Sequence, residues 1–411
     1  MCNRQQRTAR AHPVEPTLRT PVEQESRGSA WANNFDTAPE HVLRVTSAKR
    51  LHRRFLRGES SGKMNLRMAA PHAVRNLSLG KDSLDEAVAV PGDGRCDARD
   101  IRRVDAKADD RRHSRMILPQ PGEFFEWRQT AFGPSLVCRP LEKVARHLFT
   151  TRPWTLGASS LATPAAWSEL AAAMDTLSDS LIRLKQVHGQ ATLIAELVEP
   201  DAVTNPPEGD IVLSGVDTLA IAVQAADCVP LLIADRRLGV VAAAHAGWRG
   251  LAQGVPRHAV AGLVQAYGSR PEDLIAAIGP SVGSCCYEVG TDVIEAFVGG
   301  FSSDQRRRWF SERPTPTLRN PSVSGLPPVP RAGHAYFDGW TCAREQLLEA
   351  GLLDTNVFGA ELCTASHSTV LCSYRCDGRQ SGRMAGVILA RRRRERSVYE
   401  EEPLAAATGG T

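Results

Sequence analysis

The sequence predicts an α/β protein, a single domain of α/β layers around a mixed sheet over residues 116–393, preceded by a disordered N-terminal extension. Residues 1–115 are rich in Arg, Asp, Ser and Ala and show no sustained hydrophobic period of 2 or 3.6, which is typical of disorder. From residue 116 onward, short apolar runs are interspersed with amphipathic runs at helical spacing. Because these runs do not follow strict βαβ alternation, we expect a mixed sheet.

The segment MILPQPGEFFEW, which opens at Met116, looks like the natural beginning of a protein. We therefore expect residues 1–115 to result from a mis-set start, an expectation that abundant native peptides from residues 42–103 would contradict. A basic arm for nucleic acid is the alternative. It is disfavoured because acidic residues are interleaved with the arginines and no aromatic platform accompanies them.

In chain order, the first predicted helix covers residues 165–184, where apolar residues recur at helical spacing. A strand over 191–198 and a loop rich in Pro, Gly and Asp over 199–210 follow. Short apolar runs then predict three strands, the last two joined by a turn: 219–225, 229–234 and 240–245.

The second half of the domain is expected to begin with a helix over 251–267, a strand over 274–278 and a helix over 292–298. A polar, Pro-rich insert over 302–333 is interpreted as a surface excursion. The remaining predictions are a helix over 338–350, strands over 369–374 and 384–390, and a flexible tail over 394–411.

The composition limits the classes of partner. The net charge of +4 on 411 residues is too small to indicate nucleic acid or a membrane, so small molecules are the expected partners. No signal sequence opens the chain and no uncharged apolar stretch reaches about 18 residues, so a cytoplasmic location is the default. We expect a monomer or a weak oligomer. The ten cysteines are irregularly spaced, and the adjacent Cys285 and Cys286 do not form a four-cysteine zinc pattern, which favours reduced thiols.

The most informative run is GVVAAAHAGWRG at residues 239–250. An apolar strand delivers His245 to its end, and two glycines then surround Arg249 before the predicted helix begins at Gly250. Free N–H groups at a helix start attract anions, and an arginine grips phosphate or carboxylate through paired donors. This run therefore predicts an anion site.

His188, Cys228 and His245 each lie where a regular element meets a loop, which is where a scaffold presents reactive groups. Taken singly, each is more often a core residue. Together they match a catalytic zinc site, in which three N/S ligands leave a fourth position open. The same set also suits blue copper. The folded domain, however, has no His-x-His pair and offers only three methionines as axial ligands: Met116, Met174 and Met384. Zn²⁺ is therefore favoured over Cu²⁺.

A competing interpretation makes Cys228 a nucleophile, with His245 or His188 as its base and Asp227 nearby. It predicts a cysteine hydrolase or transferase. No family-specific cysteine signature surrounds Cys228, and a thiolate held by a metal is a poorer nucleophile. The two interpretations therefore compete.

Other polar residues are candidates for contacts with a substrate. The glycines of the loop 375–383 permit close approach to a ligand. An isolated arginine is usually a surface residue, but the arginines of this loop and three further residues are candidates for substrate contacts: Arg375, Arg379, Arg383, Gln186, Tyr287 and Glu288. Asp227 and Glu288 are the candidates for proton transfer. His147, His258, His334 and His367 are expected to be structural or surface residues.

Five ordered motifs resemble those of the laccase-domain proteins, a family also labelled multicopper polyphenol oxidoreductase, peptidoglycan editing factor and purine nucleoside phosphorylase. The similar segments are KQVHG at 185–189, ADCVP at 226–230, AHAGWRG at 244–250, IGPSVGSCCYEVG at 278–290 and SYRCDGRQSGR at 373–383. Two departures are a shortened segment after residue 152 and Cys376, which stands where an arginine is common.

The resemblance implies one α/β domain with zinc held by His188, Cys228 and His245. It also implies phosphorolysis of adenosine, inosine, guanosine and methylthioadenosine, together with adenosine deamination. Phosphorolysis needs an anion cradle, which Arg249 would supply, and deamination needs a metal-activated water. The alternatives are a muropeptide-editing hydrolase that uses Cys228, a copper-dependent polyphenol oxidase, and a non-enzymatic metal-binding module.

Overall fold

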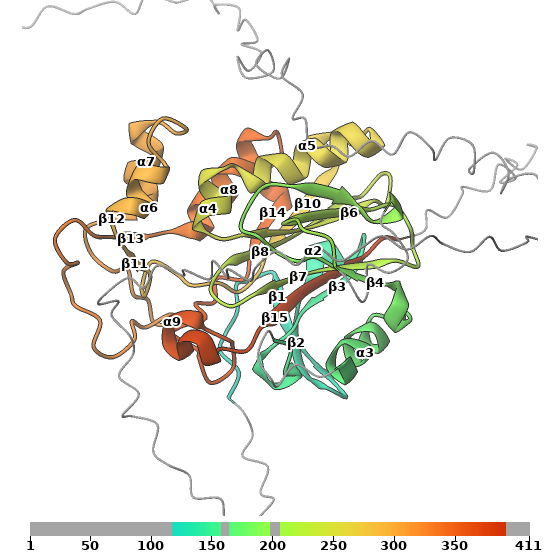
Figure 1. The fold of residues 1–411 in the computed structure, drawn as a ribbon, viewed down its shortest axis with the longest axis horizontal. Helices are drawn as coiled ribbons and strands as arrows, with labels where there is room; N and C mark the ends of the chain where they lie inside the picture. Colours follow the sequence, from blue (N-terminus) through green and yellow to red (C-terminus); the bar gives the residue numbers. More distant parts are fainter. Residues whose placement is uncertain (1–116, 158–163, 198–205, 392–411) are drawn as a thin grey trace, which may run out of the picture. The chain divides into compact units, whose positions relative to one another are not determined.

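The computed structural model of the protein describes residues 117–157, 164–197 and 206–391 (Figure 1). The extension over 1–115, the start at Met116 and the tail over 394–411 lie outside these residues. The described part is a mixed α/β structure, which confirms the predicted fold class. Its strands form two six-stranded sheets and one three-stranded sheet, where the sequence predicted a single mixed sheet.

The first six-stranded sheet joins strands from both ends of the described chain. Its order is β1 (Phe125–Thr130), β2 (Gly133–Cys138), β3 (Arg146–Phe149), β15 (Met384–Leu389), β7 (Ala220–Ala225) and β4 (Leu181–Arg183). Its neighbours pair antiparallel except for β4 and β7, which are parallel.

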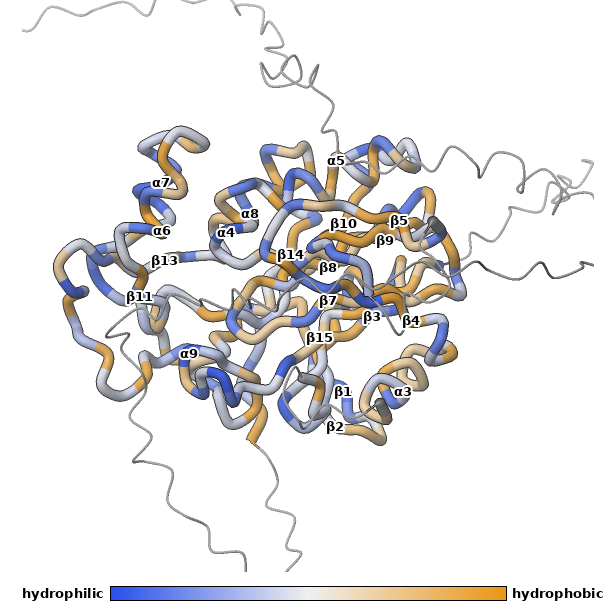
Figure 2. The backbone as a smooth tube through the Cα atoms, viewed as in Figure 1, coloured by the Kyte–Doolittle hydropathy of each residue, from blue (hydrophilic) through white to orange (hydrophobic). Residues whose placement is uncertain are grey.

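The second six-stranded sheet carries the central apolar strands. Its order is β14 (Val357–Gly359), β10 (Leu274–Ile278), β8 (Val229–Asp235), β9 (Val241–Ala246), β6 (Ile211–Ser214) and β5 (Thr192–Ile194). Every residue of β8 and β9 is buried, because both faces of the sheet are covered. Figure 2 shows hydrophobic residues concentrated along these inner strands and hydrophilic residues in the outer loops.

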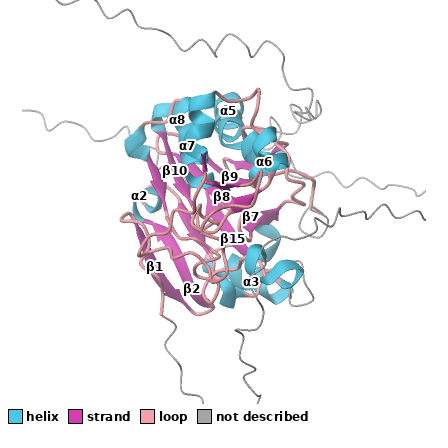
Figure 3. Cartoon of the chain, turned by 90° about the vertical axis from the view of Figure 1, so that its left-hand side faces the viewer, coloured by secondary structure: helices cyan, strands magenta, loops and turns pink. Residues whose placement is uncertain are grey.

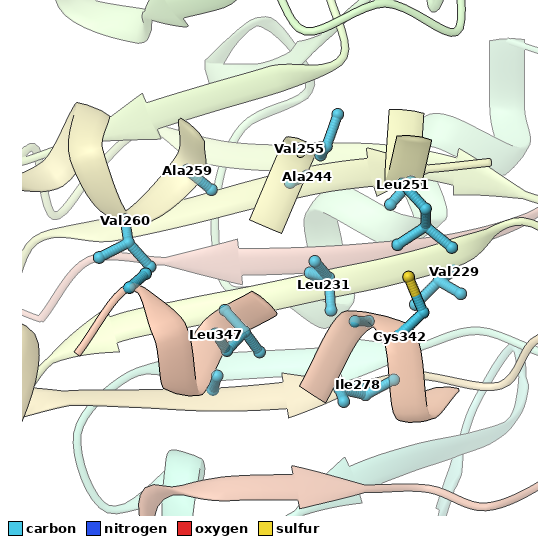
Figure 4. Packing of buried hydrophobic residues seen from close by; sticks show 14 of the residues in the cluster. Val229, Leu231, Ala244, Leu251, Val255, Ala259, Val260, Ile278, Cys342 and Leu347 are labelled. Carbon is cyan, nitrogen blue, oxygen red and sulfur yellow. The ribbon is translucent and has the colours of Figure 1, made fainter. Parts of the chain in front are cut away.

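The buried residues define four layers. Alternate residues of β8 and β9 face helices α5 (Val255–Tyr267) and α8 (Gly339–Glu349) in one core, and the residues between them face the first sheet in a second core. The other face of the first sheet packs on α3 (Pro164–Ala173). Figure 3 shows the strands between helices on opposite sides, and Figure 4 shows the packing of the first core.

The β8–β9 hairpin sets the register at the functional end of the sheet. At its turn, the Oδ1 of Asp235 accepts the N–H groups of Arg237 and Leu238, and Gly239 has φ 78°. The pairing places Val229 opposite Ala246 at the far end. Cys228 and Gly247, the next residue on each strand, therefore leave the hairpin side by side.

The structure corrects two predicted helices. The helix expected over 165–184 ends at Ala173, and its last residues form β4. The helix expected over 251–267 is two helices, α4 (Trp248–Ala252) and α5. The break falls at Gly254, whose φ of 81° is left-handed, and Pro256 then begins the first turn of α5.

Two further predictions change. The strand expected over 369–374 is absent from the described residues; this segment forms turns that lead into α9 (Tyr374–Asp377), where the Ser373 side chain accepts the N–H of Cys376. The insert over 302–333 is more than a surface excursion, because α7 (Ser303–Trp309) begins with a capping box and buries Trp309. The strand that follows α7, β12 (Phe310–Ser311), joins β11 (Glu288–Val289) and β13 (Ala335–Phe337) in the three-stranded sheet.

Short elements complete the described chain: α2 (Arg139–Glu142), α6 (Thr291–Ala296) and the 3-10 helices Arg152–Trp154, Ser178–Ser180, Ala195–Leu197, Pro271–Asp273, Asp354–Asn356 and Gly378–Gln380. Within the ranges that the structure describes, no helix combines the length and apolar character needed to cross a membrane.

Candidate metal centre

His188, Cys228 and His245 converge at one end of the second sheet. Their candidate ligand atoms all lie within 4.8 Å of one another. The Sγ of Cys228 is 4.0 Å from the Nε2 of His188, and the two imidazole rings meet edge to face with centroids 4.9 Å apart. Cys228 precedes β8, His245 lies in β9, and His188 comes from the loop after β4. Three separate elements therefore supply the three groups.

Asp210, which the sequence analysis did not single out, connects two of these elements. Its buried carboxylate accepts the backbone N–H groups of Val187, His188 and Gly189 at 2.8–3.2 Å. It also pairs with the Nδ1 of His245 at 2.8 Å. Burial alone would raise the pKa of Asp210, but its bond to His245 and these N–H donors hold it below its ordinary value. The carboxylate thus orients one imidazole and fixes the loop that carries the other, as carboxylates behind metal-binding histidines do.

Gly247 provides the space for this cluster. A Cβ atom at this position would lie 3.0 Å from the Sγ of Cys228 and 3.1 Å from the Cδ2 of His188. Both contacts are closer than ordinary van der Waals separation, so a side chain here would displace the two candidate ligands.

The cluster favours a thiolate at Cys228. Burial opposes its ionisation, but the charge of His245 and hydrogen bonds from both imidazoles outweigh it and lower the pKa of Cys228 to about 6. Burial also opposes a charge on His245, but the thiolate and Asp210 raise the pKa of His245 to about 9. A thiolate with two imidazoles is a donor set that suits Zn²⁺.

One side of the cluster faces solvent, because His188 is exposed and Cys228 is half-buried, whereas His245 is buried. Among the residues that the structure describes, the group contains no fourth His, Cys or carboxylate ligand. This arrangement fits a catalytic metal site, in which one coordination position stays open for water or substrate.

Arg249 lies on α4, two residues after Gly247. Its guanidinium rests on the ring of Trp248 at 4.2 Å and has no hydrogen-bond partner within the described part of the chain. Gly250 lies inside α4 and not at the start of a long helix, which corrects the predicted helix start. The anion site predicted for this run would therefore depend on the arginine and not on the end of a long helix.

Tyr287 and Arg375 contact each other. The guanidinium of Arg375 lies 5.2 Å from the Tyr287 ring centroid and donates to the Glu288 carbonyl at 2.9 Å. Burial, and next the negative charge of Cys228, raise the pKa of Tyr287 above its ordinary value, which places the phenol close to the cluster.

A family model described as "Multi-copper polyphenol oxidoreductase laccase" matches residues 159–391, more than half of the chain. The chain belongs to this family. The match confirms the resemblance seen in the sequence motifs.

Curated relatives of this laccase family carry two kinds of name. The chain is 35% identical over 203 residues to a protein of Xylella fastidiosa named purine nucleoside phosphorylase, covering 49% of this chain and 69% of the relative. It is 30% identical over 212 residues to a protein from an unknown prokaryotic organism named adenosine deaminase RL5, covering 50% and 73%.

Solved structures agree in fold. YlmD from Geobacillus stearothermophilus is 25% identical, with a TM-score of 0.52 over 65% of this chain and 99% of that one. A Bacillus licheniformis protein titled YfiH, at 23% identity and a TM-score of 0.55, is similar in fold over 64% of this chain and 99% of that one.

In this laccase-family chain, the two carboxylates predicted to transfer protons have partners of their own. Asp227, at φ 84°, accepts the Thr364 hydroxyl and the backbone N–H of Arg375, both at 2.5 Å. Glu288 accepts the N–H of Arg331 at 2.8 Å and pairs with its guanidinium at 3.1 Å. This geometry favours positioning roles for both carboxylates over proton transfer.

Gln186 and Arg383 also have partners within the chain. The side-chain amide of Gln186 donates to the carbonyl of Gln224 at 2.8 Å and accepts its N–H at 2.7 Å, and so continues the pairing of β4 with β7. Arg383 donates to the carbonyls of Ser381 and Gly382 in its own loop, both at 3.0 Å. Neither side chain is brought into the metal cluster.

The sequence analysis missed Asp210 and Gly247. In the sequence, Asp210 ends a predicted loop, and the apolar residues that follow it directly are the one signal of its position. Gly247 appears there only as part of the turn around Arg249.

Proposed function

We propose that this protein is a zinc-dependent purine nucleoside phosphorylase that acts on adenosine, inosine, guanosine and methylthioadenosine and also deaminates adenosine. The observation that carries the proposal is the partly open cluster of His188, Cys228 and His245 beside the unpaired Arg249. The names of the curated relatives support the same two reactions.

His188, Cys228 and His245 would hold the zinc ion, with Asp210 orienting His245. When bound, zinc would supply a Lewis acid at the open position. Copper is the alternative metal, but the described methionines do not suit an axial role. Met174 is buried against α3, and the sulfur of Met384 accepts the N–H of Cys372.

Arg249 would bind inorganic phosphate through paired N–H donors and hold it for attack on the ribose C1′. A phosphate oxygen forms the new bond to C1′ as the bond from C1′ to the base nitrogen breaks, and the base leaves with the electron pair. Arg375 adds positive charge, and Tyr287 offers a ring and a hydroxyl to the nucleoside. In deamination, water adds at the purine C6 and ammonia leaves.

The direct test uses the purified full-length protein with its zinc content measured. Each nucleoside is incubated with and without phosphate, and products are separated by chromatography. We expect the free base and ribose-1-phosphate only when phosphate is present, and inosine from adenosine in either condition. If zinc is bound and neither product forms, the proposal is wrong.

Replacing Arg249 separates the two reactions. We expect Arg249→Ala to raise the KM for phosphate about 10- to 100-fold, because charge-assisted hydrogen bonds to the anion are lost. Deamination requires no phosphate and should be nearly unchanged. Arg307→Ala, at an exposed arginine of α7, serves as the matched control. Equal losses of both reactions would contradict the phosphate role. No turnover by the parent protein or the variant, with zinc bound to both, would favour a metal-binding module.

A second candidate function is a cysteine-dependent hydrolase that edits muropeptide precursors. The pKa of Cys228 favours it: burial opposes a thiolate, but His245 and His188 overcome this and lower the pKa to about 6. The Sγ would attack an amide carbonyl carbon of the peptide, the C–N bond would break, and the leaving amine would take a proton from an imidazolium; water would then hydrolyse the thioester. Cys228→Ser decides between the candidates. A variant that keeps zinc and nucleoside turnover but loses muropeptide hydrolysis would favour the hydrolase.

A further inference from the structure

A second group of sulfur atoms lies apart from the candidate metal centre. Cys285, Cys286 and Cys363 are buried, and their Sγ atoms all lie within 4.8 Å of one another. We call these three residues the thiol cluster. Cys285 and Cys286 are neighbours in the sequence, and the fold brings Cys363 to them from 77 residues further along the chain.

Polar groups contact the sulfurs within an otherwise apolar part of the core. The backbone N–H groups of Gly283 and Ser366 point to the Sγ of Cys363 at 3.3 and 3.5 Å. The hydroxyl of Ser366 lies 3.5 Å from the sulfurs of Cys285 and of Cys286. The Ser366 hydroxyl donates to the Pro321 carbonyl at 2.6 Å, so its oxygen accepts from the two thiols. The two N–H donors aimed at Cys363 stabilise a thiolate there, whereas cysteines that only fill space need no such donors.

The apolar residues around the thiol cluster disfavour hard cations. Val282, Ala365, Val323 and Trp340 pack around the thiol cluster. Cys376 also packs against the cluster, but its Sγ donates to the Ala365 carbonyl at 3.7 Å and lies outside the group of three. Within the described ranges, no fourth His, Cys or carboxylate belongs to that group. Soft thiolates select Cu(I) or zinc, and structural zinc almost always takes four protein ligands. Three sulfurs around one ion at about 2.3 Å would lie about 4 Å apart, which agrees with the observed limit.

We propose that Cys285, Cys286 and Cys363 bind one Cu(I) ion, separately from the metal centre of the proposed enzyme. Binding deprotonates thiols and releases their protons to solvent, with no change in oxidation state. The ion would tie together the loops at 281–288 and 363–366.

These loops also support the candidate active site. The N–H of Val282 donates to the Asp227 carbonyl at 3.0 Å, and Thr364, next to Cys363, donates to the Asp227 carboxylate at 2.5 Å. Tyr287 follows Cys286 directly. Copper in the thiol cluster would therefore stabilise the loops that carry Thr364 and Tyr287, without contacting substrate.

The test requires a background in which the first centre cannot bind copper. In full-length His188→Ala/Cys228→Ala protein, Cu(I) is titrated anaerobically in competition with the chromophoric chelator bicinchoninate. We expect one equivalent of Cu(I) to remain bound, and X-ray absorption to show sulfur ligands only. Adding Cys363→Ser should abolish this binding. Cys342→Ser, at a buried free thiol on α8 outside the thiol cluster, should retain it.

Circular dichroism of each variant checks the fold. If Cys363→Ser does not fold, the absorption spectrum of the background protein still decides, because it needs no change in the thiol cluster. Nitrogen ligands, binding no stronger than that of the Cys363→Ser variant, or preferential retention of Zn²⁺ at the three cysteines would each overturn the proposal.

Discussion

The carboxylate of Asp210 holds the two candidate histidine ligands in one geometry. It pairs with the imidazole of His245 and receives three N–H groups from the loop of His188. His188 itself has φ 60°, a left-handed conformation that is unfavourable for a residue with a side chain. These hydrogen bonds therefore hold a strained residue in the position where it can act as a ligand.

Asp210→Asn should weaken zinc binding about 10- to 100-fold, because the amide loses the negative charge and one acceptor behind the ligands. Competition with a chromophoric chelator measures the affinity. Asp304→Asn, at an exposed carboxylate of α7, is the control and should leave the affinity unchanged. If the Asp210→Asn variant bound zinc as tightly as the parent protein, Asp210 would not be an orienting group.

Gly247→Ala tests the space behind the cluster. The added methyl group would meet Cys228 and His188 at 3.0 and 3.1 Å, so we expect zinc affinity to fall by about tenfold or more while the protein stays folded. Gly300→Ala adds the same methyl group where no atom lies nearer than 4.0 Å. Equal zinc affinities for the two variants would show that the close approach at Gly247 has no role in the site.

At the scale of the elements, the break between α4 and α5 positions Arg249, the residue proposed to bind phosphate. Gly254 is left-handed, and its carbonyl accepts the backbone N–H of His258 in α5 at 3.0 Å. A continuous helix would carry Arg249 along the axis of α5. Because of the break, α4 is a separate helix, and it packs against β9 and α8.

Gly254→Ala should lower the free energy of unfolding by about 1–2 kcal/mol, because a left-handed conformation is costly for a residue with a Cβ atom. Urea denaturation measures the loss, with Gly300→Ala again as the control. If the alanine variant were as stable as the parent, a left-handed residue would not be needed at this break.

At the scale of the whole molecule, acid stability should depend on His147 in β3. Its imidazole is buried, accepts the N–H of Cys138 at Nε2 and contacts the Ala145 carbonyl at Nδ1. Burial, with a smaller effect from Arg128, lowers the pKa of His147 to about 4. The unfolded chain therefore takes up this proton first as the pH falls.

The contribution of His147 to stability is complete above about pH 6.5 and is lost as the pH falls from there toward 4, by up to about 3 kcal/mol. His147→Gln, which cannot titrate, should show a shallower decline in the free energy of unfolding over this interval. His258→Gln on α5 is the control and should follow the parent protein. Parallel curves for the parent and His147→Gln would contradict the prediction.

The elements that could be predicted from sequence are those whose pattern is local. The strands over 219–225, 229–234, 240–245 and 274–278 are confirmed to within a residue or two, because they are buried on both faces and therefore uniformly apolar. The helix expected over 165–184 was wrong in its second half. A three-residue strand such as β4 has too few residues to show a period, and only its pairing with β7 defines it.

The residues His188, Cys228, His245 and Arg249 were identifiable from sequence alone, because histidine, cysteine and arginine next to glycine turns carry their chemistry in their side chains. Their convergence was decided by tertiary structure: the β8–β9 register sets Cys228 beside His245, and the carboxylate of Asp210 draws in the loop of His188. The same holds for Cys363 in the thiol cluster. The sequence by itself thus determined the fold class, the family motifs and the reactive groups. The folded chain decided which of these groups share a site, because hydrogen bonds and packing between residues distant in sequence have no local pattern.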